Sequence, residues 1–259
     1  MNSTPSDSQT LIGASGMLQL ISITGSKGKK LVKKISKTQL PKETIKAKLE
    51  SLIFLKENPS PLLFPLLSFW QDSDFIFVES LMLPGRPLSE LVIQSKNLPI
   101  LAGLAVIKQL LSICLEYSTR RFMHYDIRCE KIIIDDEGRV TLVDNGCSLP
   151  FSSEDMSKFA VELDTIYLPP EGLSHGVGET HMVYALGMIW YFMLCGEMCW
   201  YEPPENERQS KIEFPRKVIE KVSQEIRNTI EEMVKFRKED RPSLKEMLII
   251  VENLEKIEK

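Results

Sequence analysis

One short stretch of the chain, from His124 to Lys131, holds most of the residues that could do chemistry. It carries a histidine, two acidic side chains and two basic ones, with Asp126 and Lys131 near its two ends. Carboxylates accept protons and coordinate hard metal ions, whereas lysine and arginine donate hydrogen bonds to anions such as phosphate. A further aspartate, Asp144, follows shortly afterwards. We therefore treat this stretch as the candidate site and ask which elements position it.

Short strands are expected on the C-terminal side of the candidate stretch. Ile132–Ile134 and Val140–Val143 are apolar and β-like, and Asp135–Gly138 between them is typical of a turn. Longer patterns at helical spacing surround them. These helices are expected from about Pro99 to Arg121, after Thr180, from Ser223 and from Ser243. Ser243 and Glu246 form a capping-box pattern, which predicts a helix start.

Strand patterns dominate the first third of the chain. Leu11–Ile23 and Lys30–Ile35 predict two strands joined by a turn, and a helix is expected after Pro41. Leu66–Trp70 and Phe75–Val78 predict two further strands. The sequence therefore predicts an α+β protein of two lobes. A polar tail covers residues 1–8, a small β-rich lobe with one helix covers 9–79, a linker covers 80–86, and a larger, mainly helical lobe covers 87–259.

Composition and charge exclude several classes of protein. The 259 residues are 43% hydrophobic and 26% charged, which is ordinary for a globular chain with a buried core. A net charge of −4 does not favour electrostatic capture of nucleic acid. The polar N-terminus lacks a signal-peptide pattern, and the apolar run 182–196 is short for a membrane span. Five scattered cysteines predict reduced thiols. We expect a cytoplasmic protein without nucleic-acid binding or membrane insertion.

The order of these features resembles the eukaryotic-type protein kinase family. That family has an H-R-D-L-x-x-x-N motif, then two strands, then D-F-G. Here His124-Tyr125-Asp126 begins the first motif, Lys131 stands at its asparagine, and Asp144-Asn145-Gly146 stands at the second. The resemblance extends over nearly the whole chain and implies a bilobal kinase fold.

The family's functional positions carry over by this resemblance. It implies that Asp126, as a base or its vestige, and Arg128 are the catalytic residues, and that Asp144 is a metal ligand. Structural roles are implied for His124 and for a pair between Glu171 and Arg241. Lys33 resembles the phosphate-contacting lysine, Glu50 its ion-pair partner, and Val78 the gatekeeper. The implied nucleotide-binding residues are Gly13, Leu31, Lys33, Glu50, Val78, Glu79, Leu81, Lys131 and Ile133.

Lys131 is the most consequential departure from the family pattern. It replaces the asparagine that ligates the second metal ion. An ammonium has no lone pair and carries the same sign of charge as Mg²⁺, so it cannot coordinate that ion. The alternative is that Lys131 simply extends into solvent. In either case the asparagine oxygen is missing.

Other departures weaken the nucleotide site and its scaffold. Ser15 and Leu18 stand at two glycines of the phosphate loop, and Leu31 at a small alanine against adenine. Asn145 replaces an aromatic residue, Met182 an aspartate that holds the catalytic loop, and Tyr125 an arginine that reads phosphorylation. Outside these motifs, we expect His175 and His181, which lie in a Gly-rich segment, to be exposed.

These losses predict a pseudokinase that acts as a protein-binding scaffold or allosteric regulator. We expect a protein partner, ATP as a candidate ligand, and poor binding of Mg²⁺. One alternative is a weakly active, atypical Ser/Thr kinase that uses Asp126, Asp144 and Lys33 with a single metal. Another is a nucleotide sensor in which Lys131 neutralises phosphate without metal.

Overall fold

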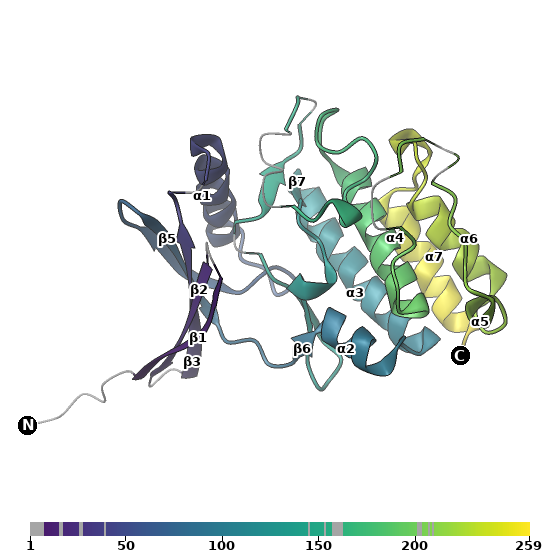
Figure 1. Ribbon diagram of the computed structural model, residues 1–259, viewed down its shortest axis with the longest axis horizontal. Helices are drawn as coiled ribbons and strands as arrows, with labels where there is room; N and C mark the ends of the chain where they lie inside the picture. The colour runs from purple at the N-terminus through teal and green to yellow at the C-terminus, as the bar shows by residue number, and fades with distance from the viewer. Residues whose placement is uncertain are drawn as a thin grey trace, which may run out of the picture. The chain divides into compact units, whose positions relative to one another are not determined.

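The computed structural model divides the chain into two compact units. It describes residues 8–15, 18–25, 28–38, 40–144, 146–152, 154–156, 163–200, 204–206, 208 and 210–259, with side chains from residue 30 onward. One unit comprises Met1–Pro84 and Asp144–Cys147, and the other comprises Gly85–Val143 and Ser148–Lys259 (Figure 1). The boundary after Pro84 falls inside the expected linker. Asp144–Cys147, however, joins the first unit, although the sequence placed these residues in the second lobe.

A five-stranded antiparallel sheet forms the first unit. The strands are β1 (Ser8–Ser15), β2 (Leu18–Gly25), β3 (Gly28–Ser36), β4 (Leu66–Gln71) and β5 (Phe75–Leu81). Their order in the sheet is β1-β2-β3-β5-β4. The prediction of two strands before Pro41 was wrong: the stretch expected as one strand is divided into β1 and β2, which pair with each other from Ser8–Thr24 to Ser15–Leu18.

Helix α1 (Lys42–Glu57) packs beside β4 in the first unit. Pro41 precedes its first turn, where a missing N–H costs nothing because that group has no helical acceptor. Ala47, Ser51, Leu52 and Leu55 are buried at helical spacing. One face of α1 therefore belongs to the core of this unit.

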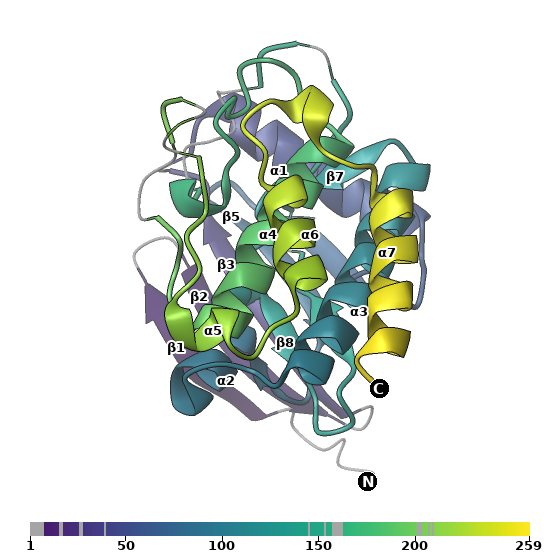
Figure 2. The same cartoon turned by 90° about the vertical axis from the view of Figure 1, so that its right-hand side faces the viewer.

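Helices dominate the second unit, where several lie side by side (Figure 2). They are α2 (Leu88–Ser95), α3 (Ile100–Thr119), α4 (Glu179–Cys195), α5 (Arg216–Ile219), α6 (Gln224–Met233) and α7 (Leu244–Ile257). Helix α3 packs against α4 and α7, and α4 also packs against α6. Tyr117, Tyr184 and Trp190 are fully buried among them. The four predicted long helices are confirmed, and Ser243 and Glu246 form the predicted capping box.

Helix α3 is unusually apolar for its length. Among the described residues it is the one helix long and apolar enough to cross a bilayer, and half of its apolar stretch is buried inside the protein. Its packing against α4 and α7 accounts for that burial. These contacts are typical of a core helix.

Short strands frame the candidate stretch in the second unit. β7 (Phe122–His124) pairs with β10 (Ser148–Pro150). β8 (Ile132–Ile134) lies between β6 (Arg86–Pro87) and β9 (Val140–Leu142). The predicted strand pair after Lys131 is therefore confirmed. The candidate stretch runs from the end of β7 to the start of β8, so both of its ends are fixed by strand pairing.

Gly196 provides a test of the packing at the end of α4. It has φ +79°, and a Cβ there would lie 1.9 Å from the Lys96 carbonyl oxygen. Gly196→Ala should therefore lower the free energy of unfolding by about 2–4 kcal/mol, measured by chemical denaturation. Gly138→Ala is the matched control, because Gly138 has φ +75° and nothing within 4 Å of the added methyl. It should cost only about 1 kcal/mol. Equal losses in the two variants would contradict this account.

Candidate functional site

His124 holds the backbone of the candidate stretch in the second unit. Its Nδ1 accepts a hydrogen bond from the Asp126 amide at 3.2 Å, and its Nε2 lies 3.3 Å from the Val143 carbonyl oxygen. An amide only donates and a carbonyl only accepts, so the two contacts together place the proton on Nε2. The ring of Tyr117 contacts His124 edge-on, with centroids 5.9 Å apart. The predicted structural role of His124 therefore has a geometric basis.

Asp126 and Lys131 form an ion pair across this stretch. Their side chains are only 9% and 12% exposed. Arg128 adds a second, longer contact from Nε to the other carboxylate oxygen, at 3.4 Å. The Asp126 carboxylate therefore faces two cations supplied by its own loop.

The loop conformation places Lys131 where it can reach Asp126. Cys129–Lys131 form a 3₁₀ turn, and the Lys131 amide donates to the Arg128 carbonyl at 2.9 Å. The Val143 amide donates to the Lys131 carbonyl at 2.8 Å, which ties the turn to the chain beyond β9. The sequence reading in which Lys131 extends into solvent is wrong. Sequence reasoning also missed the ion pair, because a separation of five residues has no regular meaning in a loop.

Two neighbours of the ion pair have packing roles. Ile133 lies in β8, opposite Thr141 and Pro87, and is half-buried. Cys129 is fully buried, and burial raises the pKa of its thiol to about 12. A thiol with that pKa is protonated at neutral pH and is not a nucleophile. The nucleotide contact implied for Ile133 stays a prediction.

In the first unit, strand register brings three of the predicted nucleotide-binding positions onto one face of the sheet. Lys33 lies opposite Val78 and Leu31 lies opposite Ser80 in the β3–β5 pair. Cross-strand partners point to the same face, and residues two apart on a strand do so as well. Leu31, Lys33 and Val78 therefore share that face. Val78 is 1% exposed, and its implied role as gatekeeper stays a prediction.

Two other predicted nucleotide-binding residues, Glu79 and Leu81, differ in their surroundings: Glu79 is bound by neighbouring side chains, and Leu81 is exposed. The Glu79 carboxylate accepts hydrogen bonds from Lys30 Nζ at 2.8 Å and Ser68 Oγ at 2.6 Å. The Lys30 contact, followed by that of Ser68, lowers the pKa of Glu79. Leu81, at the end of β5, is exposed. Their contribution to nucleotide binding stays a prediction.

The side chains of the loop that the resemblance implies for phosphate binding lie outside the described part of the chain. Gly13 lies in β1, opposite Leu20, next to an irregularity in the pairing with β2. The side chains of Ser15 and Leu18 lie outside the described part of the chain, as does Asn145. Met182, in contrast, is fully buried in α4. It packs as a core residue at the position where the resemblance implies an aspartate.

The predicted partner of Lys33 is wrong. Glu50 lies on the exposed face of α1, where it pairs with Lys46 at 3.7 Å. Its side chain is 51% exposed and does not pair with Lys33. Lys48, two residues earlier, is on the buried face with an exposure of 4%. The inward-facing residue in this part of α1 is therefore a cation rather than a carboxylate.

Asp144 is fully buried in the same unit. Its Oδ1 accepts a hydrogen bond from the Cys147 amide at 2.7 Å, which closes a tight turn. Gly146, inside this turn, has φ +83° and lies against the backbone of Lys48. The predicted metal-binding carboxylate is thus held in the interior beside α1.

A second ion pair ties together distant parts of the second unit. Arg241 donates to both carboxylate oxygens of Glu171, at 2.7 and 2.8 Å. It also donates to the carbonyls of Lys235 and Phe236 and lies over the ring of Tyr184. A buried guanidinium needs such complete pairing because an unpaired charge is costly in the interior. The structure contains the Glu171–Arg241 pair that the resemblance implied.

His181 lies beside this pair, and the expectation that it is exposed was wrong. It is 4% exposed, 3.9 Å from Glu171, and its Nε2 donates to the Gly172 carbonyl at 2.8 Å. His181 belongs to the first turn of α4, which faces the core, and not to the preceding loop. His175 is exposed, as expected.

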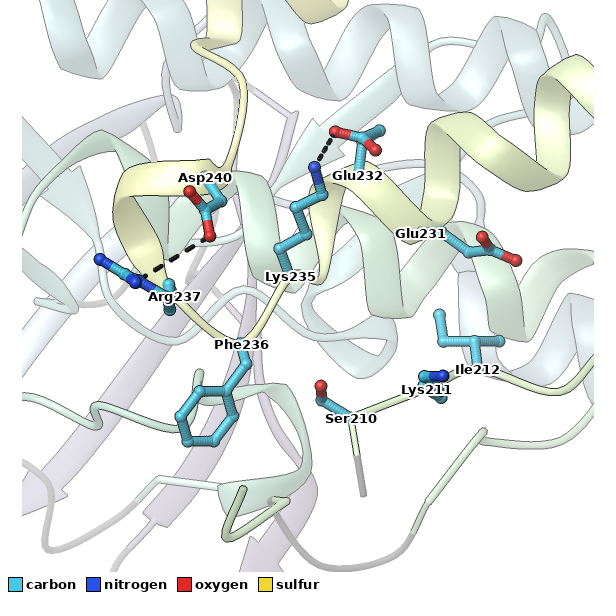
Figure 3. Close-up of a pocket in the computed structure, with 9 residues that line it drawn as sticks. All are labelled: Ser210, Lys211, Ile212, Glu231, Glu232, Lys235, Phe236, Arg237 and Asp240. Carbon is cyan, nitrogen blue, oxygen red and sulfur yellow. Dashed lines mark ion pairs between the residues drawn. The ribbon is translucent and has the colours of Figure 1, made fainter. Parts of the chain in front are cut away.

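The second unit also has a surface cavity of about 520 Å³ (Figure 3). Its lining includes Lys235, which pairs with Glu232, and Arg237, which pairs with Asp240. Each of these charges is therefore matched by a neighbour a turn away. None of the predicted site residues lines this cavity, and it adds nothing to the candidate chemistry.

The pKa of His181 gives a prediction about pH. Burial lowers this pKa below the ordinary value of 6.5, although Glu171 opposes the shift. Below about pH 6.5 the unfolded chain therefore binds a proton that the folded chain excludes, and stability falls as the pH falls. His181→Gln removes this titration, so the variant should lose less stability between about pH 7.5 and pH 5.5 in urea unfolding. His175→Gln, at an exposed site, should behave as the wild type. Identical pH slopes for all three proteins would contradict the prediction.

Comparisons with known proteins agree with the architecture. Residues 12–250 match the family model described as protein kinase domain. Similar curated proteins include serine/threonine-protein kinase PSK2 of Saccharomyces cerevisiae, at 24% identity, and Aurora kinase A-A of Xenopus laevis, at 26%. These alignments cover 79% and 84% of this chain but 18% and 54% of the relatives, so the chain spans about half of their length or less. The match extends over both the sheet-based unit and the helical unit, and the chain therefore belongs to the protein kinase domain family.

Proposed function

We propose that this kinase domain is a pseudokinase, which regulates or holds a protein partner and transfers phosphate weakly or not at all. The observation that carries the proposal is the ion pair between Asp126 and Lys131. In phosphoryl transfer, the aspartate at this position accepts the proton of the attacking hydroxyl. The Lys131 ammonium occupies one carboxylate oxygen of Asp126, and Arg128 lies near the other, so neither oxygen is open to a substrate hydroxyl. The orientation of the carboxylate is also set by the lysine and not by a substrate.

The residues do not fit the two magnesium ions of a kinase. Lys131 offers no lone pair at the position where the family has a metal ligand. Its charge is compensated by Asp126, the carboxylate to which the resemblance assigns the catalytic role. Among the residues that the structure describes, no group of three or more His, Cys, Asp or Glu side chains could hold a metal ion. Hard divalent ions need several oxygen ligands. The residues around Asp126 therefore do not supply the oxygen ligands that Mg²⁺ needs.

An active Ser/Thr kinase is the main alternative. Asp126, Asp144 and Lys33 are all present, and the similar proteins named above are protein kinases. Activity of this kind would require Asp126 to be released from Lys131. The nucleotide-sensor alternative requires the Lys131 ammonium to bind phosphate, and its pairing with Asp126 argues against that use.

The partner and the cellular site are also proposals. A domain that no longer relies on turnover acts through binding, so we propose a protein partner, without nucleic acid or membrane insertion. The five cysteines form no disulfide bonds with one another. Free thiols are usual in the reducing cytoplasm, which is where we place the protein.

Phosphate transfer from radiolabelled ATP tests the proposal directly. The wild type and Asp126→Asn should label a generic protein substrate, or the chain itself, at the same background rate. Asparagine keeps the shape of the aspartate but cannot accept a proton, so it abolishes general-base catalysis. A wild-type rate that is well above background and is lost in Asp126→Asn would overturn the pseudokinase assignment and favour the active kinase.

Replacing Lys131 should restore part of the metal dependence. Lys131→Asn removes a like charge and supplies an amide oxygen, so Mg²⁺ should tighten ATP binding by about tenfold relative to wild type. Thermal-shift titrations with ATP, with and without Mg²⁺, measure the change. Lys131→Met is the control, because it removes the charge without adding an oxygen and should regain less. An unchanged or weaker affinity in Lys131→Asn would contradict the prediction.

A further inference from the structure

Lys48 is a buried cation in the first unit. It lies on the inner face of α1 with an exposure of 4%, next to Ala47, Ser51 and Leu52, which are also buried. An ammonium is costly to remove from water unless a negative group compensates it. The location of that negative group decides what Lys48 does.

Asp144 is the one carboxylate suited to this role among the described side chains of the first unit. Glu79 is occupied by Lys30 and Ser68. The remaining described carboxylates are exposed and belong to Glu43, Glu50, Glu57, Asp72 and Asp74. Only Asp144 is fully buried.

The turn after Asp144 brings this carboxylate close to Lys48. A Cβ added to Gly146 would lie 3.0 Å from the Lys48 carbonyl oxygen and 3.1 Å from its Cβ. Gly146 thus contacts the helix at the base of the Lys48 side chain. Asp144 is two residues away, and the Cys147 amide folds its carboxylate back over the turn. The four methylene groups of a lysine side chain are long enough to carry the Lys48 ammonium from the backbone of α1 to the Asp144 carboxylate.

We propose that the Lys48 ammonium is the internal counter-ion of Asp144. The pair fastens α1 to Asp144–Cys147 and places a fixed positive charge on the carboxylate that the family uses for metal. The consequence for metal binding deepens the proposed function and rests on it. The ion pair itself does not, because it can be detected through stability alone.

A double-mutant cycle tests the pair. Lys48→Met and Asp144→Asn should each lower the thermal midpoint by on the order of 5–10 °C, because each leaves a buried charge uncompensated. The double variant should lose little more than either single variant. Lys46→Met is the matched control on the exposed face of the same helix, where the side chain is 78% exposed. It should shift the midpoint by no more than about 2 °C. Additive losses in the cycle would overturn the proposal.

A second measurement does not need Lys48→Met to fold. Without the Asp144 carboxylate, the Lys48 ammonium would lose its counter-ion in the interior, and the side chain would turn outward to water. Acylation followed by mass spectrometry should therefore modify Lys48 at least about tenfold faster in Asp144→Asn than in wild type, with Lys46 unchanged. Equal rates at Lys48 would overturn the pair. Neither readout involves phosphate transfer, so a kinase-active wild type would refute the proposed function and leave this inference standing.

Discussion

The compensation of buried charge governs the helical unit of this protein. In the helical unit, the carboxylate of Asp126 is shielded from solvent and is matched by Lys131, with Arg128 at 3.4 Å. An uncompensated carboxylate in such a place would be destabilising by several kcal/mol. In the loop between β7 and β8, the ion pair of Asp126 with Lys131 and the hydrogen bonds of His124 hold the backbone together. On the proposed function, this arrangement keeps the Asp126 carboxylate from a substrate hydroxyl.

Arg241 shows the same constraint in a purely structural setting. Its guanidinium collects Glu171, two backbone carbonyls and the face of Tyr184 around one buried point. The residues concerned come from before α4, within α4 and between α6 and α7. Arginine suits this position because its donors are fixed in a plane and its charge persists at any accessible pH. The Glu171–Arg241 pair that the family pattern implies is therefore present in a chain that departs from that pattern at Lys131.

Sequence patterns located most elements because apolar spacing and caps are local signals. Helices α3, α4, α6 and α7 and strands β8 and β9 all lie where those signals fall. The predictions were wrong where it matters which side of a helix a residue faces. Glu50 and Lys48 are about 200° apart around α1, so a shift of two residues exchanges an exposed carboxylate for a buried cation. The prediction that His181 is exposed was wrong for a related reason. The glycine-rich stretch suggested a loop, whereas His181 lies in the first turn of α4 and faces the core. The ion pair between Lys131 and Asp126 could not be predicted from the sequence, because it depends on the conformation of a loop, for which residue spacing gives no signal.

The Lys131 contact also constrains how the sequence can change. Lysine and asparagine codons differ only in their third base, so a return to the family's asparagine is a short genetic step. That step would remove the Lys131 ammonium from the buried Asp126 carboxylate, with the guanidinium of Arg128 still at 3.4 Å. On the proposed function, that single change would lower stability while the departures at Leu31, Asn145 and Met182 remained. It would therefore be disfavoured as a first step towards activity, because most proteins have little stability to spare.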